Sequence, residues 1–199
     1  RRASSGKLIT RHVDEPAMLA RNDTTVRDPR YLRRHALSLL EFYHQRSVDT
    51  THGGFVPQIS DRDGTVYDAR AKLLPATARF VFNYSVGALL DGPHYCEEMA
   101  AHGIRHLERH HRDDRHGGYV WQLDGQAVAD GGKRCYGHAF VLLAYATAAR
   151  AGVPGARERI EPAYALLDDH FWEDEYGRCR VELDRDWSGT SDYRGQNAN

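Results

Sequence analysis

The 199-residue chain lacks the sequence features that cysteine-stabilised, membrane-spanning and secreted proteins require. Its three cysteines, Cys96, Cys135 and Cys179, are widely spaced and form no C-x-x-C pair, which argues against a disulfide framework or a thiolate zinc site. No apolar run approaches the ~20 residues of a membrane-spanning helix, and residues 1–10 lack the apolar stretch of a secretory signal. We therefore expect reduced cysteines in a soluble, cytoplasmic protein.

An excess of charge of one sign is also lacking. The 27 Lys and Arg residues are interspersed with 28 Asp and Glu residues, and the net charge is −1. Nucleic acids and anionic membranes are bound by surfaces of one sign, so neither is an expected partner. Hydrophobic residues make up 41% of the chain, which is enough for a packed core.

The chain does have apolar residues at helical spacing in five stretches. Two of them, at about 71–90 and 135–150, are apolar almost all round, as is typical of a buried helix. The other three, at about 29–46, 93–112 and 156–172, are amphipathic. Asp28-Pro29 is a suitable cap and first residue for the first of these helices. The sequence therefore predicts a mostly helical protein in which two kinds of helix alternate.

Segments rich in strand and turn residues, at about 52–67, 116–128 and 176–187, separate the helices. Asp and Gly in them favour tight turns, so each is predicted to form a short hairpin. Gly54, Gly118 and Gly177 align between the segments and lie 64 and 59 residues apart. The chain thus repeats a unit of about 60 residues: an amphipathic helix, a hairpin and a mostly buried helix.

This alternation predicts an all-α toroid. The buried helices would form its inner ring, the amphipathic helices its outer ring, and the hairpins would gather at one mouth. An open-ended array of repeats leaves an apolar interface uncovered. We therefore expect residues 28–199 to form the N-terminal half of a larger domain, preceded by an N-terminal extension at 1–27.

Histidines recur every four residues at His102, His106 and His110, a spacing that can bind a metal. Arg105 and Arg109 lie among them, and their positive charge opposes a divalent cation. We interpret these histidines as part of a solvated helix face and expect no metal site.

The acid pairs Asp113-Asp114 and Asp168-Asp169 could indicate a glycosidase, which needs two facing carboxylates. Both pairs lie near the ends of amphipathic helices, so we interpret them as capping or solvating those ends. The sequence contains neither the G-x-S-x-G motif of serine hydrolases nor a phosphate-binding glycine fingerprint.

Polar residues on the predicted inner helices are the remaining candidates. Lys72, Arg79 and Asn83 share one side of the 71–90 helix, where a charge needs an ion pair or a water-filled cavity. Tyr136 and Asn197 lie at the starts of the next two inner helices, and their spacing follows the repeat. Symmetry then predicts that Arg79, Tyr136 and Asn197 lie near one end of a central cavity. The alternative, in which Arg79 pairs with a buried carboxylate and Tyr136 only packs, has equal weight at this point.

Three segments together resemble the N-acylglucosamine 2-epimerase superfamily. They are K-x-x-x-x-x-A-R-x-x-x-x-Y at 72–84, R-C-Y-G-H-A-F at 134–140 and Y-R-G-Q-N-A-N at 193–199. They are most similar to its aldose–ketose isomerase branch, which comprises mannose isomerases and sulfoquinovose isomerases. The resemblance spans about 28–199 and implies an (α/α)6 barrel of about twice this length.

The resemblance also implies roles for three residues. Arg79 would be catalytic, contacting the sugar oxygens at the reacting carbons, while Tyr136 and Asn197 would bind the substrate. The family's two acid–base histidines belong to the second half of the barrel and have no counterpart here. The histidine of the N-x-x-x-H motif that opens at Asn197 would fall beyond Asn199.

The resemblance implies an aldose–ketose isomerisation through a cis-enediol, without cofactor or metal. The conversion of D-mannose to D-fructose is the preferred assignment of the substrate. The expected partner is a small-molecule monosaccharide, and a homo-oligomer is left open. A 2-epimerase of the N-acylglucosamine or cellobiose type, a sulfoquinovose isomerase and a non-enzymatic glycan-binding helical scaffold remain as alternatives.

Overall fold

In a computed structural model that describes residues 27–189 and Tyr193, the first helix begins where its capping residues predict. The carboxylate of Asp28 accepts a hydrogen bond of 2.9 Å from the backbone N–H of Arg30, and Pro29 is the first helical residue. The expected N-terminal extension, apart from Arg27, and Asn197 both lie outside the described residues.

Helices form most of the described chain. The helices are α1 (Pro29–Ser47), α2 (Leu74–Leu89), α3 (Tyr95–His106), α4 (Cys135–Arg150) and α5 (Ile160–Leu166). A π-helical turn of five residues continues α3 at Leu107–His111, and another continues α5 at Leu167–Phe171. The five predicted helical stretches are thus confirmed, within a few residues at their ends. None of the described helices is long and apolar enough to cross a membrane.

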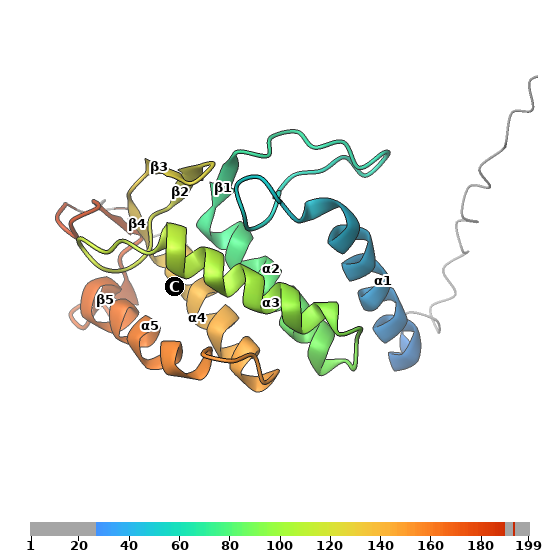
Figure 1. Ribbon diagram of the computed structural model, residues 1–199. Coiled ribbons are helices and arrows are strands. Elements are labelled where there is room, and N and C mark those ends of the chain that lie inside the picture. Colours follow the sequence, from blue (N-terminus) through green and yellow to red (C-terminus); the bar gives the residue numbers. More distant parts are fainter. Residues whose placement is uncertain (1–26, 190–192, 194–199) are drawn as a thin grey trace, which may run out of the picture.

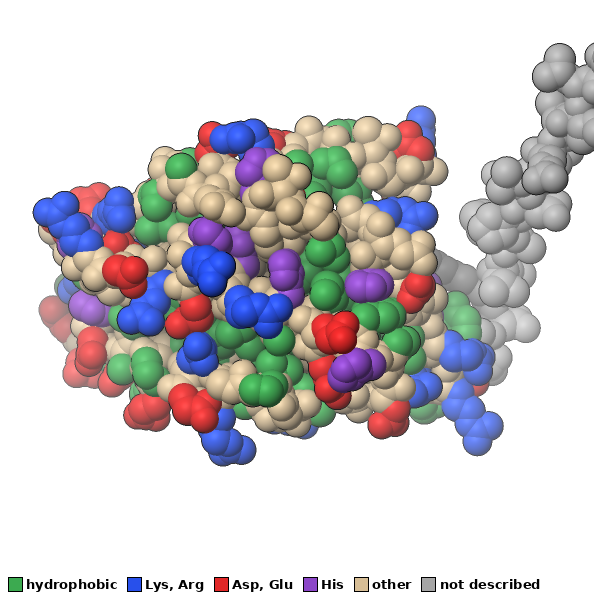
Figure 2. Space-filling view, in the orientation of Figure 1, with side chains coloured by type: hydrophobic (Ala, Val, Ile, Leu, Met, Phe, Trp, Pro, Cys, Tyr) green, Lys and Arg blue, Asp and Glu red, His purple; other side chains and the backbone are tan. Residues whose placement is uncertain are grey.

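The helices are arranged in two layers. Helices α2 and α4 pack side by side, and α3 and α5 lie over them on one face (Figure 1). The main core fills the space between these layers, with Leu74, Val81, Ile104 and Tyr145 among its buried members. Acidic and basic side chains are mixed over the outer face that α3 and α5 form (Figure 2). The inner helices are therefore the mostly apolar ones and the outer helices the amphipathic ones, as the sequence predicts.

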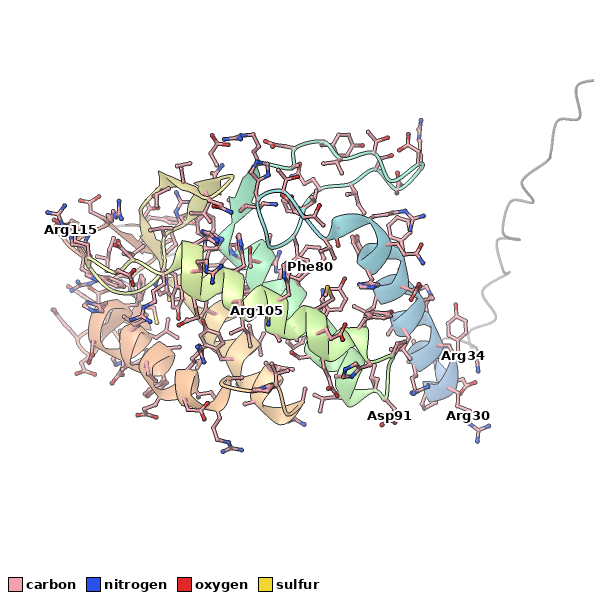
Figure 3. The ribbon with its side chains drawn as sticks, in the orientation of Figure 1. Arg30, Arg34, Phe80, Asp91, Arg105 and Arg115 are labelled. Carbon is pink, nitrogen blue, oxygen red and sulfur yellow. The ribbon has the colours of Figure 1, made fainter. Side chains whose placement is uncertain are left out.

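At the margin of this arrangement, α1 contacts α2. The side chains of Arg30 and Arg34 extend from its beginning away from the other helices (Figure 3). Phe80 of α2 is half-buried, and its ring stacks on Phe55 with 4.5 Å between centroids.

Short strands gather at the end of the bundle where α2 and α4 begin (Figure 1). A three-stranded antiparallel sheet contains β1 (Ala71–Leu73), β2 (Gln122–Asp124) and β3 (Ala127–Asp130). Two further antiparallel pairs join β4 (Lys133–Arg134) to β7 (Glu182–Leu183) and β5 (Trp172–Glu173) to β6 (Arg178–Cys179). The strands thus lie at the starts of the inner helices.

Two predicted boundaries are wrong. Residues 71–73 belong to β1 and not to the second helix, because they pair with β2 across the sheet. The third hairpin is β5–β6, earlier than predicted, because the chain turns at Gly177, whose N–H donates to the carbonyl of Glu173 at 2.9 Å. Residues 182–183 pair with β4 instead of closing that hairpin.

A loop of sequence D-x-x-H-G-G occurs twice, at 49–54 and 113–118. Its two glycines have positive φ in both copies, between 65° and 80°. A Cβ on Gly54 would lie 2.7 Å from the ring of His106, and one on Gly118 would lie 2.6 Å from the ring of Trp187. Only glycine meets both the conformation and the close approach.

Each copy of this loop encloses a buried lysine that lies two residues before an inner helix. The ammonium of Lys72 donates to Asp49 at 2.6 Å and to the carbonyl of Phe55 at 3.0 Å. The ammonium of Lys133 donates to Asp113 at 3.0 Å and to the carbonyl of Gly117 at 2.7 Å. Both lysine side chains have no exposed surface, so each pair ties the start of α2 or α4 to the loop.

These pairs correct two interpretations. Lys72 does not share a cavity-facing side with Arg79, because it lies in β1 and is buried in its ion pair. Asp113 does not solvate a helix end, because Lys133 and Arg185 both bind its carboxylate in the interior. Asp114, Asp168 and Asp169 are exposed, as the solvated interpretation requires.

The histidines of α3 are a third correction. His106 is only 4% exposed and packs under Gly54, and His111 in the following π-helical turn is fully buried. His102 reaches the carbonyl of Gly54 at 3.1 Å. A solvated face is therefore the wrong description, because this side of α3 is turned towards the first D-x-x-H-G-G loop. In the described part of the chain, no three His, Cys, Asp or Glu side chains are grouped so as to hold a metal.

Candidate active site

Arg79 of α2 and Tyr136 of α4 meet between the two inner helices. The guanidinium Nη2 of Arg79 donates a hydrogen bond to the hydroxyl oxygen of Tyr136. The guanidinium carbon lies 4.4 Å from the ring centroid of Phe140 and 5.6 Å from that of Tyr136. Because α2 and α4 are neighbours and their burial patterns match, residues separated by about one repeat come together on the exposed side of both helices.

The charge of Arg79 has no acidic partner among the residues that the structure describes. Within residues 27–189 and 193, no carboxylate forms an ion pair with its guanidinium, whose partners are a phenol and two aromatic faces. The side chain is exposed. The alternative of a buried ion pair is therefore not what the described residues contain. Aromatic faces orient a guanidinium without neutralising it, so the group remains available to an oxygen-rich ligand.

A cavity of about 270 Å³ lies beside Arg79, between α1 and α2. Asn83, one turn further along α2, also lines it, so two of the three polar residues that the sequence groups on this helix reach the cavity. The remaining lining residues are apolar or aromatic: Leu40, Tyr43, Pro57, Ala76 and Phe80. Small-molecule sites have volumes of ~300–1,000 Å³, so this cavity is close to the lower end of that range.

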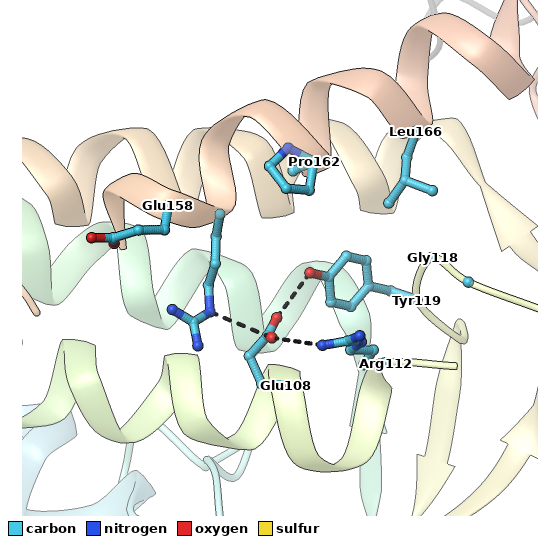
Figure 4. A pocket seen from close by; sticks show the side chains of 10 residues that line it. Glu108, Arg112, Gly118, Tyr119, Glu158, Pro162 and Leu166 are labelled. Atoms are coloured by element: carbon cyan, nitrogen blue, oxygen red, sulfur yellow. Dashed lines mark hydrogen bonds and ion pairs between the residues drawn. The ribbon is translucent and has the colours of Figure 1, made fainter. Parts of the chain in front are cut away.

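A larger cavity of about 500 Å³ lies on the outer side, between the end of α3 and α5 (Figure 4). Its central acid, Glu108, accepts hydrogen bonds from the hydroxyls of Tyr145 at 2.6 Å and Tyr119 at 2.9 Å. The guanidinium of Arg159 lies 3.4 Å from its other oxygen. Burial alone would raise the pKa of Glu108, but the two tyrosine hydrogen bonds and the nearby arginines lower it. Glu108 is thus a carboxylate whose hydrogen-bonding and charge partners are already in place.

His138, two residues after Tyr136, is a structural residue. The N–H of Tyr119 donates to its Nε2 at 3.1 Å, so its Nδ1 carries the proton and donates to the carbonyl of Arg134 at 2.8 Å. Burial lowers its pKa to about 4. A neutral imidazole with both nitrogens bonded cannot exchange protons with a substrate.

The structure adds Phe140 and Tyr43 to the residues that the sequence singles out. Phe140 follows Tyr136 by one helical turn, and their ring centroids lie 5.0 Å apart. That spacing was visible in the sequence, but an aromatic pair one turn apart is more often part of a core. Tyr43 borders the cavity from α1, and no sequence pattern connects it to α2. Asn197 is not among the described residues, so its place beside Arg79 and Tyr136 stays a prediction.

Comparisons with known proteins agree with the arrangement of these helices. The family model described as N-acylglucosamine 2-epimerase (GlcNAc 2-epimerase) matches residues 53–199. A D-mannose isomerase from Marinomonas mediterranea is 40% identical over 169 residues, which cover 85% of this chain and 42% of that protein. A D-mannose isomerase from Thermobifida fusca is 46% identical over 113 residues, which cover 56% of this chain and 28% of that protein.

Solved structures show the same similarity. A crystal structure of D-mannose isomerase superposes with a TM-score of 0.80 at 39% identity, covering 86% of this chain and 44% of that one. A cellobiose 2-epimerase from Spirochaeta thermophila superposes with a TM-score of 0.73 at 24% identity, covering 91% and 45%, which shows a shared fold alone. The chain therefore spans less than half the length of the relatives that it matches.

Proposed function

The chain belongs to the N-acylglucosamine 2-epimerase family, and from that premise we propose that it forms the sugar-binding side of an aldose–ketose isomerase. The proposed reaction is the conversion of D-mannose to D-fructose, which the 40% identity to a D-mannose isomerase supports. The observation that carries the proposal is the contact between Arg79 and Tyr136, which leaves a guanidinium with no carboxylate partner among the described residues, beside a cavity between α1 and α2.

We propose that residues 28–199 form the N-terminal half of an (α/α)6 barrel and that residues 1–27 are an extension. The superposition on a protein of about twice the length supports this arrangement. Apolar side chains exposed on α1, α2 and α4, among them Leu39, Leu89 and Leu143, are surfaces that a second half would cover.

In the proposed mechanism a base removes the proton from C2 of the aldose, and the resulting cis-enediol is protonated at C1 to give the ketose. The developing negative charge lies on O1 and O2. Arg79 would donate to these oxygens, and because its guanidinium is already oriented by Tyr136 and Phe140, little reorganisation is needed as the charge develops. Tyr136 and Asn197 would bind the sugar hydroxyls. The net oxidation state of the sugar does not change, so the reaction consumes no redox cofactor.

The acid and the base of this mechanism are expected from the part of the relatives' length that this chain does not span. His106, His111 and His138 are buried, and burial lowers the pKa of each. None of them reaches the cavity beside Arg79. The family resemblance implies two histidines in the second half of the barrel, and histidine has a pKa suited to both proton transfers.

A sugar 2-epimerase is the second candidate, favoured by the name of the matching family model. It would share the enediolate and the role of Arg79 but would return the proton to C2 from the other face. A sulfoquinovose isomerase would differ only in the group carried at C6 of the sugar.

Turnover in D2O by the full-length protein that contains this chain would distinguish these functions. With mannose, we expect deuterium at C1 of newly formed fructose. Deuterium at C2 together with formation of glucose would instead show a 2-epimerase. Turnover of sulfoquinovose but not of mannose would show a sulfoquinovose isomerase. No exchange with any of these sugars would refute the proposal. Residues 1–199 by themselves are expected to give no turnover, which provides the matched control.

A further inference from the structure

Two cysteines from distant parts of the sequence meet at the start of α4. Cys135 is the first residue of α4, and Cys179 lies in β6. Cys135 forms a small apolar cluster with Phe171 and Leu183, and Cys179 packs against this cluster. Cys179 is near enough to Cys135 to help raise its pKa.

The backbone holds the two thiols together. The N–H of Cys135 donates to the carbonyl of Val181 at 3.0 Å, and β4 and β7 pair directly beside this bond. Residue 135 therefore lies opposite residue 181, which stands in the short connection between β6 and β7. Cys179, the last residue of β6, is two residues from this point, so the chain brings both cysteines to the start of α4.

The two thiols differ in their access to solvent. Cys135 is 3% exposed, whereas Cys179 is half-buried. Burial and the neighbouring Cys179 raise the pKa of Cys135 to about 12, so Cys135 stays protonated at neutral pH. A soluble oxidant would therefore meet Cys179 first. Cys96, the third cysteine, is fully buried in the main core, away from this cluster.

We propose that Cys135 and Cys179 form a reversible disulfide that links β6 to the first turn of α4. With a low-molecular-weight disulfide such as glutathione disulfide as the oxidant, the Cys179 thiolate attacks one sulfur and releases one glutathione thiolate. The sulfur of Cys135, losing its proton to solvent, then displaces the second glutathione from Cys179. In total, two protein thiols become one disulfide, and one glutathione disulfide becomes two glutathione thiols.

Tyr136 is the residue next to Cys135, so the disulfide would fix the first turn of α4 at the point where Tyr136 contacts Arg79. This consequence rests on the proposed function, whereas the disulfide itself does not. In a reducing compartment both cysteines remain thiols, and neither forms a disulfide in this structure. The pair would respond only to oxidising conditions.

The test is peptide mapping of the full-length protein after equilibration with glutathione redox buffers. Trypsin cleaves after Arg134, Arg150, Arg178 and Arg180, so the disulfide would join peptide 135–150 to dipeptide 179–180. We expect this linked peptide, two hydrogens lighter than the sum of its parts, to appear under oxidising conditions and to disappear with dithiothreitol. Glutathione remaining on Cys179, or a disulfide between two protein copies, would overturn the proposal.

Matched variants separate the pair from the third cysteine. Cys179→Ser and Cys135→Ala should each abolish the linked peptide, whereas Cys96→Ser should leave it unchanged. Melting of the oxidised protein should shift several degrees above that of the reduced one in wild type and Cys96→Ser, because a cross-link restricts the unfolded chain. An identical shift in Cys179→Ser would contradict the assignment.

The link to the active site has its own readout. The KM for the sugar should differ between oxidised and reduced wild type by at least ~2-fold, and oxidation should leave the KM of Cys179→Ser unchanged. A linked peptide with an unaltered KM would overturn the coupling to Tyr136. Because the peptide map does not depend on turnover, failure of the proposed sugar chemistry would leave the disulfide result intact.

Discussion

Two successive repeat units, residues 49–89 and 113–150, share one set of residues and differ in another. Both contain a D-x-x-H-G-G loop and a buried lysine paired with the aspartate of that loop. The pattern of buried and exposed positions along α2 recurs along most of α4 at an offset of 60 residues. At that offset Arg79 corresponds to Ala139 and Tyr136 to Ala76. The recurring aspartate–lysine pairs hold the starts of the helices in place, whereas the two polar residues that meet in the candidate site, Arg79 and Tyr136, do not recur.

The two lysine pairs are not equally enclosed. Asp49 binds Lys72 and the ring of His52. Asp113 binds Lys133 and also the guanidinium of Arg185, at 2.8 Å and 3.2 Å, while the ring of Trp187 lies 5.3 Å from the ammonium of Lys133. The residues after β7 therefore complete the second pair. The same D-x-x-H-G-G loop therefore has different numbers of charged partners in neighbouring repeats.

Lowering the pH should produce the largest loss of stability, because neutral, buried histidines pack in both units. His106 packs under Gly54 and His138 under Gly118, and burial lowers their pKa values to about 3 and about 4. Burial also lowers the pKa of His111 to about 4. The unfolded chain takes up protons near pH 6.5 and the folded one does not, so stability is complete above that pH and is lost as pH falls towards 4. Each pKa unit is worth ~1.4 kcal/mol, so each histidine contributes on the order of 3–5 kcal/mol.

The free energy of unfolding, measured by denaturant titration between pH 7.5 and 4, tests this expectation. The carboxylates of Asp49 and Asp113 have pKa values well below the usual range. Burial raises the pKa of each, but the partners of the carboxylates, Lys72 for Asp49 and Arg185 with Lys133 for Asp113, lower it by more. Protonation of these carboxylates therefore adds a further loss of stability only below about pH 4. His94→Gln, at an exposed position, should leave the profile unchanged. A flat profile between pH 6.5 and 4 would show that the buried histidines gain protons without cost.

Removing the acid of one lysine pair should produce the next largest effect. Asp113→Ala leaves Lys133 buried without its carboxylate, and breaking a buried pair in this way costs ~3–5 kcal/mol. Asp49→Ala should cost less within that range, because Asp113 also holds Arg185. Thermal and denaturant unfolding of both variants would compare the two units directly. Asp114→Ala, at a side chain 91% exposed, is the control and should change stability by less than ~0.5 kcal/mol. A larger loss for Asp49→Ala would reverse the comparison.

Replacing Arg79, which has no carboxylate partner among the described residues, should affect activity and leave stability nearly unchanged, the reverse of the effect expected for the lysine pairs. In the full-length enzyme, Arg79→Ala should lower kcat by ~10²–10³, about 2.7–4 kcal/mol, with little change in stability. Arg79→Lys should not restore activity, because an ammonium lacks the planar fork that spans two neighbouring oxygens. Measuring kcat and melting on the same preparation separates the two roles. Arg105→Ala, at an exposed arginine on α3, should change neither quantity. If Arg79→Ala melts early yet keeps near-normal kcat, Arg79 belongs with the structural lysines.

Tyr136, which contacts Arg79 from the second unit, should give the smallest effect. Tyr136→Phe removes one neutral hydroxyl, which is worth ~0.5–1.5 kcal/mol, so KM should rise about threefold to tenfold while kcat changes less. Steady-state kinetics on the full-length protein measure this change. Tyr164→Phe, at an exposed tyrosine on α5, serves as the control. An unchanged KM with a lowered melting temperature would assign Tyr136 to packing.

Local sequence pattern was a good guide to where the helices lie along the chain. The start of α1 at Pro29 followed from its cap, and the positions of α2 and α4 followed from their apolar runs. Contacts between distant segments were not predictable in the same way. Lys72 appeared to continue the helix, but pairing between β1 and β2 removed it, and Asp113 appeared solvated until residues 133 and 185 enclosed it.

By itself the sequence determined the alternation of the helices, the 60-residue repeat and the spacing that brings Arg79 to Tyr136, because each depends on periodicity along one chain. The tertiary structure alone decided which charges are neutralised. A cation on an inner helix or in the strand just before it is structural or available to a ligand according to whether a carboxylate from another segment reaches it. Lys133 meets Asp113 across 20 residues, whereas within the described part of the chain Arg79 meets the aromatic residues Tyr136 and Phe140 and no carboxylate. That distinction depends on the distance between segments in space, which periodicity along the chain does not encode.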